Sequence, residues 1–172
     1  MGEGHSSYET GDLGMMYLTR AEVLPLGSFK DYSEGDFARS NTAKLSIAAA
    51  FAYLQDGKKD SGIVGDTPAD GGTTDTLNAT ADISFRFSGL SLESAFFWRE
   101  GTRNAGEELD ENGELIPADA PRDGTGYYLQ SGYMLPNSQM EITGRYGQLL
   151  AASEESSLED LSEAGTGFNL YF

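Results

Sequence analysis

The side chains that could act on a solute are charged residues at alternate positions in several segments of the chain. Inside a channel, a row of arginines lowers the barrier for phosphate-like anions. Neighbouring acids and bases can instead compensate one another and stiffen the wall that carries them. Both roles are open for the charged residues of this chain, and the sequence favours the second. Nine of these residues are candidates for lining a pore: Arg20, Glu22, Lys44, Asp82, Arg86, Glu93, Arg99, Glu141 and Arg145.

Charge is distributed unevenly between these positions and the rest of the chain. The nine residues include five bases and four acids, whereas the 172-residue chain has 28 acidic and 11 basic residues and a formal charge of −17. The surplus acids lie in connecting segments such as 107–114 and 154–163, which either are solvated loops or bind divalent cations. Such acidity argues against a nucleic-acid partner.

Catalysis has little support in the sequence. His5 is the one histidine and there is no cysteine, which excludes zinc-type sites and Cys/His pairs. The serines lack a G-x-S-x-G setting, and no glycine-rich phosphate loop occurs. Residues 110–114 superficially suggest a calcium loop but lack the EF-hand spacing. We therefore expect a protein that is not an enzyme and has no cofactor or metal.

The charged residues must be positioned by β-strands, because apolar and polar residues alternate with a period of two. The uncharged side of these runs carries one charge, Glu100, at a strand end. The better runs reach the roughly 9–11 residues that cross a bilayer, and no stretch of about 18 apolar residues could form a transmembrane helix. Seven runs are predicted strands: 13–24, 42–54, 76–87, 90–99, 127–134, 139–146 and 168–172.

This pattern predicts an all-β fold, an antiparallel transmembrane β-barrel over residues 13–172 with about seven or eight strands in this chain. Residues 1–12 are expected to be disordered or a partial strand. Tight turns are expected at Ser88-Gly89 and 135–138, while the connection 27–41 is long although it falls on the same side. Long loops on one side of a membrane barrel lie outside the cell. The predicted extracellular loops are 55–73, 100–124 and 151–164.

Aromatic residues occur near both ends of the uncharged side. Amphipathic rings settle at headgroup depth in a lipid-facing barrel wall. We therefore predict two aromatic girdles and an outer-membrane location in contact with lipids. The outer girdle comprises Phe51, Tyr53, Trp98, Tyr127 and Tyr146, and the periplasmic girdle comprises Phe85, Phe87, Tyr133 and Phe172.

Two segments resemble a known family. Residues 14–22 (GMMYLTRAE), followed by 24–27 and 32–36, and the closing residues 165–172 (GTGFNLYF) resemble the phosphate-selective porin O and P family. The resemblance implies a sixteen-stranded outer-membrane barrel, typically a trimer, that passes phosphate or other anions. This chain would then be a C-terminal portion that needs partner strands from the rest of the barrel or from other copies. Arg20 and Glu22 carry over as lumen-facing residues.

Three functions fit the pattern. The first is a bacterial outer-membrane porin, or part of one, for passive diffusion of small polar or anionic solutes, including phosphate. The second is a small closed outer-membrane barrel of about eight strands that acts as an anchor or adhesion protein. The third is a soluble β-barrel that binds a ligand between inward-facing aromatics. The third differs from the first two in which face of the sheet meets water.

Overall fold

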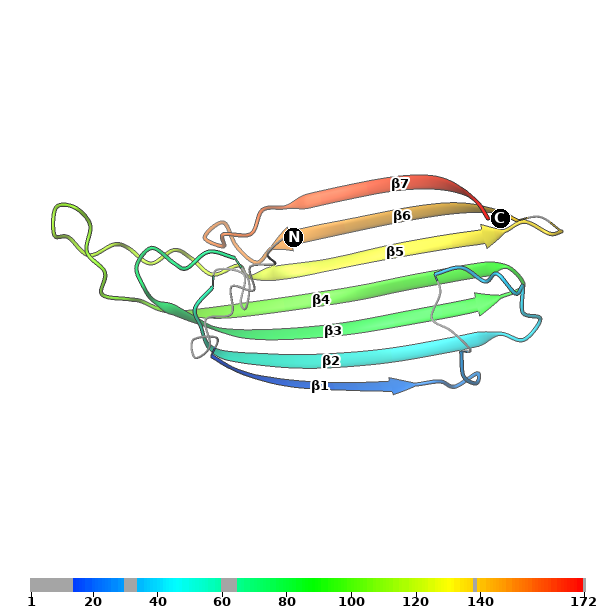
Figure 1. The fold of residues 1–172 in the computed structure, drawn as a ribbon, viewed down its shortest axis with the longest axis horizontal. Helices are drawn as coiled ribbons and strands as arrows, with labels where there is room; N and C mark the ends of the chain where they lie inside the picture. Colours follow the sequence, from blue (N-terminus) through cyan, green and yellow to red (C-terminus); the bar gives the residue numbers. More distant parts are fainter. Residues whose placement is uncertain (1–13, 30–33, 60–64, 138, 172) are drawn as a thin grey trace, which may run out of the picture.

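The chain forms a single antiparallel sheet. The computed structural model describes residues 14–29, 34–59, 65–137 and 139–171. Within them lie seven strands in chain order, each paired to the next (Figure 1). There is no helix long and apolar enough to cross a membrane in these ranges. The strands are β1 (Met15–Val23), β2 (Lys44–Gly57), β3 (Thr73–Phe87), β4 (Leu90–Asn104), β5 (Gly124–Met134), β6 (Met140–Ala151) and β7 (Leu161–Leu170).

The all-β antiparallel prediction is confirmed, but several strands are longer than the alternating runs. Thr73 pairs with Asn104, so β3 and β4 both extend into the predicted loops. Leu161 pairs with Leu149, so β7 begins seven residues before the predicted residue 168. Backbone pairing sustains these ends without an apolar alternation that the sequence could reveal. The long connections are correspondingly shorter: 58–72, 105–123 and 152–160.

The two ends of the sheet differ in their connections (Figure 1). At the short-turn end, Ser88 and Gly89 join β3 to β4 with φ values of 53° and 92°. Positive φ at both central residues is characteristic of the two-residue hairpin turn whose twist matches that of the flanking strands. The predicted tight turn is therefore confirmed. The three long connections all lie at the opposite end, which we call the long-connection end.

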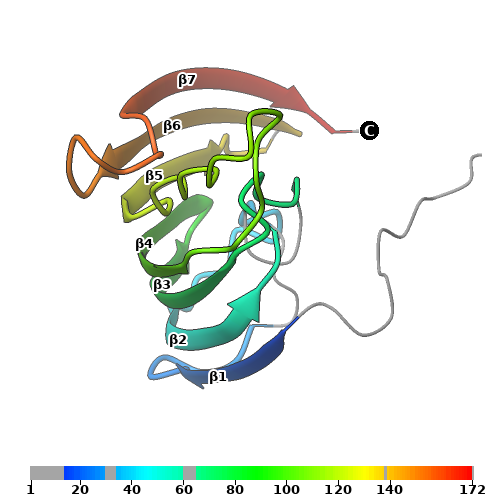
Figure 2. The same ribbon diagram turned by 90° about the vertical axis from the view of Figure 1, so that its left-hand side faces the viewer.

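The sheet bends into an open trough from β1 to β7 (Figure 2). Among the described residues no strand pairs with the outer edge of β1 or of β7. Seven consecutive antiparallel strands leave β1 and β7 running in the same direction (Figure 1). The sheet is therefore not closed in the part of the chain that the structure describes.

The two faces of the trough have opposite character. Directly paired residues point to the same side of a sheet, so the register assigns each side chain to a face. Described parts of the connections lie inside the curve (Figure 2). Phe29 of the β1–β2 connection lies over Arg86, so the face with the alternating charges is the concave one. The convex face is apolar and open: Phe51 is 44% exposed and Leu129 and Ile142 are each 54% exposed.

An ordinary apolar core is missing from the described residues. Four apolar residues are buried among the described residues: Ala48, Leu54, Ala95 and Met134. Eight polar or charged residues are buried, including Arg86 and Glu141 on the concave face. The sheet thus buries polar side chains inside its curve and exposes apolar ones outside.

Candidate functional site

The concave face of the sheet is the candidate site. The structure places all nine predicted pore-lining residues on this face, although they come from five different strands. The sequence pairs them as near neighbours along a strand, for example Asp82 with Arg86. The structure instead forms ion pairs between strands: Arg20 reaches across β2 to Asp82, and Arg86 reaches a diagonal position on β4.

Arg20 and Asp82 form a two-pronged ion pair across β2. The guanidinium donates to both carboxylate oxygens, at 2.7 and 3.0 Å. The intervening concave positions of β2 are Ala48 and Ala50, whose small side chains leave room for this reach. The two side chains are 48% and 32% exposed, so solvent screens the pair and it contributes only about 0.2–1 kcal/mol.

Arg86 and Glu93 form a second pair nearer the short-turn end. Their closest atoms are 4.0 Å apart, and the Ser84 hydroxyl also faces Glu93 at 3.4 Å. Arg86 is buried because the ring of Phe29, from the β1–β2 connection, lies over its guanidinium at 4.9 Å. The charge is thus flanked by a carboxylate and an aromatic face, both of which favour a cation.

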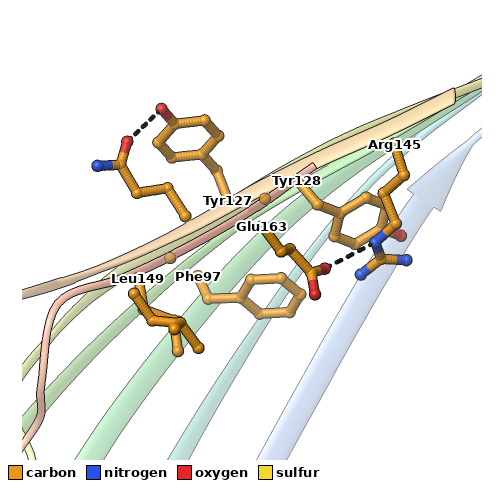
Figure 3. Close-up of a pocket in the computed structure, with 10 residues that line it drawn as sticks. Phe97, Tyr127, Tyr128, Arg145, Leu149 and Glu163 are labelled. Carbon is orange, nitrogen blue, oxygen red and sulfur yellow. Dashed lines mark hydrogen bonds and ion pairs between the residues drawn. The ribbon is translucent and has the colours of Figure 1, made fainter. Parts of the chain in front are cut away.

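Arg145 is the centre of a third cluster (Figure 3). Its Nε donates to Glu163 at 3.1 Å, and a terminal nitrogen donates to the Gln130 side chain at 3.3 Å. The guanidinium also lies 4.5 Å from the centre of the Tyr128 ring, and that ring stacks with Phe97 at 6.3 Å. This cluster joins β4, β5, β6 and β7 across the concave face.

Glu141 is buried near the short-turn end. It accepts hydrogen bonds from the Asn169 amide at 3.0 Å and from the Tyr171 hydroxyl at 2.6 Å. That hydrogen bond, together with burial, raises the pKa of the Tyr171 hydroxyl. Gly132 on β5 is a diagonal neighbour of Glu141, and a Cβ there would overlap the carboxylate. Glu141 therefore fastens the last described residues to the wall.

The remaining predicted residues lie on the same face with simpler surroundings. Glu22 accepts a 2.5 Å hydrogen bond from the Ser46 hydroxyl on the neighbouring strand. Lys44 lies directly opposite Arg86 in the β2–β3 register. Arg99 lies on β4 toward the long-connection end and lines a hollow there.

Two charged residues of the concave wall were missed by the sequence analysis, Arg103 and Glu163. Both lie in strand extensions beyond the recognised alternation. With them the wall holds six bases and five acids, so it remains nearly neutral. Every ion pair that the structure defines on this wall joins a base to an acid from another segment, as in Arg145–Glu163.

Arg103 fixes the connections at the long-connection end. It donates to Asp70 at 2.5 Å, and Asp70 is only 1% exposed. Burial opposes ionisation of the Asp70 carboxyl, but N–H donors from Gly106, Gly72 and Arg103 outweigh it and lower its pKa. One buried carboxylate therefore holds the β2–β3 connection against the start of the β4–β5 connection.

The β1–β2 connection fastens the short-turn end. Buried Asp36 accepts the Gly89 N–H at 2.7 Å, and Arg39 donates to the Met134 carbonyl. Further along the same face, Phe37 packs edge-on against Tyr171 at 4.7 Å. The described parts of this connection thus extend from β3 to the end of β7 and narrow the trough there. The sequence showed its unusual length but not its path.

On the last three strands, several positions of the concave face are glycines and therefore carry no side chain. They alternate with large side chains of the adjacent strand: Gly126 lies opposite Phe97, and Gly147 lies opposite Tyr128. Alternation of small and large residues is how inward-facing positions fit a tightly curved wall. It also leaves a hollow of about 240 Å³ whose lining includes Phe97, Tyr128, Arg145 and Glu163 (Figure 3). The glycine positions at issue are Gly124, Gly126, Gly132, Gly147, Gly165 and Gly167.

Eight of the nine predicted girdle residues lie on the convex face. Figure 3 shows the contrast between neighbours: Tyr127 projects to the side opposite Tyr128 and bonds Gln148 at 2.7 Å. Phe172, the ninth, lies outside the described residues. The structure adds Tyr17, Phe96 and Phe168 to the convex set. The strand register places these eight predicted girdle residues on the convex face: Phe51, Tyr53, Phe85, Phe87, Trp98, Tyr127, Tyr133 and Tyr146.

Charge is nearly excluded from the convex face. Over the described strands, and leaving aside the bulge near the end of β2, its charged side chains are Asp75 and the expected Glu100. Both lie in the half of the sheet near the long connections. Asp75 was missed because the sequence placed it before the strand began.

The acidic segment at 110–114 has a structural explanation. Asp110 accepts backbone N–H groups of Glu114 and Asn112, each at 2.8 Å, and these bonds lower the pKa of its carboxyl despite an opposing desolvation effect. No group of three or more potential ligand residues is close enough to hold a metal ion in the described ranges. The segment is a carboxylate-stabilised turn in the β4–β5 connection.

Comparison with protein-family models, with curated proteins and with solved structures gave no match.

Proposed function

We propose that this sheet is part of the wall of an outer-membrane pore through which small polar solutes diffuse passively. One observation carries the proposal: the convex face is apolar and the concave face carries the charges. A soluble sheet or barrel would bury its apolar face and turn its charges to bulk water. The opposite arrangement suits a wall with hydrocarbon outside and water inside.

The extent of the strands supports a bilayer-spanning role. A tilted strand needs about 9–11 residues to cross the hydrocarbon. β3 and β4 have 15 residues each, and β2 has 14. These are long for soluble proteins, in which strands of about 5–6 residues are commonest.

The spacing of the convex aromatics also supports this role. Tyr53 lies opposite Leu77 on β3, and Phe87 lies ten residues further along that strand. At about 3.3 Å per residue and a tilt near 40°, this separation is about 25 Å along the membrane normal. That value matches the height of the apolar band of outer-membrane barrels. Asp75 and Glu100 would then lie at or beyond its outer edge.

The two open edges must be paired in such a wall, because unpaired backbone groups are costly in lipid. We propose that the remaining strands of the barrel, from the same protein or from other copies, complete it. β1 and β7 run in the same direction, so an all-antiparallel closure requires an odd number of additional strands. The resemblance to the sixteen-stranded, trimeric porin family agrees with this requirement.

The proposed transport involves no chemical step. The described concave wall is a mixture of paired charges, hydroxyls and amides. Its charged groups would set which solutes enter, as side chains lining a channel do. Phosphate and other anions stay among the candidate solutes because the bases exceed the acids by one.

Ion conductance in planar bilayers tests this proposal directly. The detergent-purified protein should insert and produce stepwise currents that scale linearly with voltage. Insertion without current would contradict the pore and favour a closed barrel that acts as an anchor. Stable, monodisperse protein in buffer without detergent would contradict the membrane location and favour the soluble binder.

A further inference from the structure

We propose that the concave wall between β1 and β7 carries a binding track for neutral, polyhydroxylated solutes, that is, for short oligosaccharides. This inference rests on the proposed pore and names the solute class that its wall would recognise. The site is the chain of hollows whose junctions are formed by Phe97 and Tyr128.

Three hollows follow one another along the concave face. The central one, of about 240 Å³, contains Arg145 and Glu163 (Figure 3). It shares Phe97 with a hollow of about 300 Å³ toward the long connections. It shares Tyr128 with a hollow of about 190 Å³ beside Arg20 and Asp82. Each is somewhat smaller than, or at the lower limit of, the roughly 300–1,000 Å³ of drug-sized sites, so a series of ring-sized units fits better than one large ligand.

Each junction is an aromatic ring that lines two of the hollows. The Phe97 and Tyr128 rings stack at 6.3 Å with an interplanar angle of 30°. Gly126 and Gly147 lie opposite them and add no side chain, so the hollow beside the rings is bordered by Leu149, next to Gly126, and by Glu163, next to Gly147. A pyranose ring has an apolar C–H face that packs on an aromatic ring and a periphery of hydroxyl groups. An aromatic platform flanked by polar groups is complementary to that shape.

The polar groups beside the rings present donors and acceptors in equal measure. Arg145 is bound to Glu163, and Arg20 is bound to Asp82. Such a pair offers guanidinium N–H donors and carboxylate acceptors to a sugar hydroxyl, which can accept and donate at once. The wall around the rings is therefore suited to neutral hydroxylated solutes.

An anion is a poorer fit at these two hollows. Its charge would lie beside Glu163 or Asp82 as well as beside the arginines, and like-charge contact is costly when water is partly excluded. The geometry therefore points to sugars here rather than to phosphate.

Current block by maltotriose tests the inference, with inorganic phosphate as the anion probe. Maltotriose should reduce the ion current of the reconstituted protein in a saturable manner. The double variant Phe97→Ala/Tyr128→Ala should raise the half-blocking concentration about tenfold or more, the effect of losing about 1.4 kcal/mol of aromatic contact. The single variant Tyr128→Phe keeps the aromatic ring and should retain most of the block that maltotriose causes in the wild-type protein. Tyr127→Ala, the same truncation one residue earlier on the convex face, should leave the half-blocking concentration unchanged.

Two outcomes separate failure of the track from failure of the pore. An open pore that maltotriose does not block, or that phosphate blocks more strongly at equal concentration, would overturn the sugar track and leave the pore intact. Saturation-transfer NMR of maltotriose on the detergent-purified protein reads binding without requiring current. Binding that depends on Phe97 and Tyr128 in a protein that never conducts would support the track and overturn the pore.

Discussion

Ala81 on β3 offers the sharpest test of which face meets hydrocarbon. It lies on the convex face, opposite Ala49 on β2 and Phe96 on β4. It is eight residues from Thr73 and six from Phe87, or about 26 and 20 Å along the strand. In the proposed wall this position is close to the middle of the bilayer. Ala81→Arg therefore places a full charge where hydration is least available.

The expected cost of Ala81→Arg follows from that depth. Arginine on the lipid face costs about 2–4 kcal/mol at the bilayer midplane and about 0–1 kcal/mol near the interfaces. The folding equilibrium should therefore fall by about thirty-fold to nearly a thousand-fold. Thr80→Arg is the matched control, because Thr80 faces the concave side and lines a hollow. It should change stability by no more than about 0.5 kcal/mol, as surface substitutions usually do.

Urea titration of folding into phospholipid vesicles measures both variants, with the mobility shift of folded barrels on gels as the readout. A large destabilisation by Ala81→Arg and almost none by Thr80→Arg is the expected result. If the convex face met water, Ala81→Arg would be neutral. Equal stability of the two variants would therefore refute the assignment of the faces.

Three further predictions concern the concave wall and its connections. Asp70→Ala leaves Arg103, whose side chain is 11% exposed, without its carboxylate and should destabilise the long-connection end by about 3–5 kcal/mol, seen as faster proteolysis there. Because the folded-state pKa of Asp70 is lowered, its contribution should be complete above pH of about 4 and decline as pH falls through the lower, folded-state pKa, so wild-type proteolysis should rise in acid while that of Asp70→Ala stays constant. Glu163→Gln uncouples an arginine and should shift the reversal potential toward anion preference; an unchanged potential would show that this pair does not face the ion path. Gly132→Ala sets a Cβ against the Glu141 carboxylate and should lower the free energy of unfolding, measured by urea titration, by about 1–3 kcal/mol. Unchanged stability of this variant would mean that the Glu141 side chain moves aside without cost.

The sequence predicted the strands best where apolar and polar residues alternate without interruption. On β3, every second residue from Leu77 to Phe87 is apolar, and this stretch lies within the observed strand. The alternation fails in the first part of β7, where Ser162, Glu163, Gly165 and Gly167 give no apolar side. That segment is a strand because β6 offers it a paired edge, which is a tertiary effect.

The candidate site was predictable as a face but not as a set of contacts. Alternation assigns Arg20 and Asp82 to the same side, yet they are 62 residues apart and meet only because two strands register against the small residues of β2. The hollow around Tyr128 depends likewise on Gly147 lying directly opposite it. Register is fixed by turns and pairing over the whole sheet, which no single segment encodes.

Trp98 gives the most direct measurement of the central claim, since it is the one tryptophan of the chain and lies on the convex face. In bilayers of brominated lipids its fluorescence should be strongly quenched, while aqueous iodide should quench it little. Strong quenching by iodide and none by the brominated acyl chains would contradict a lipid-facing convex surface.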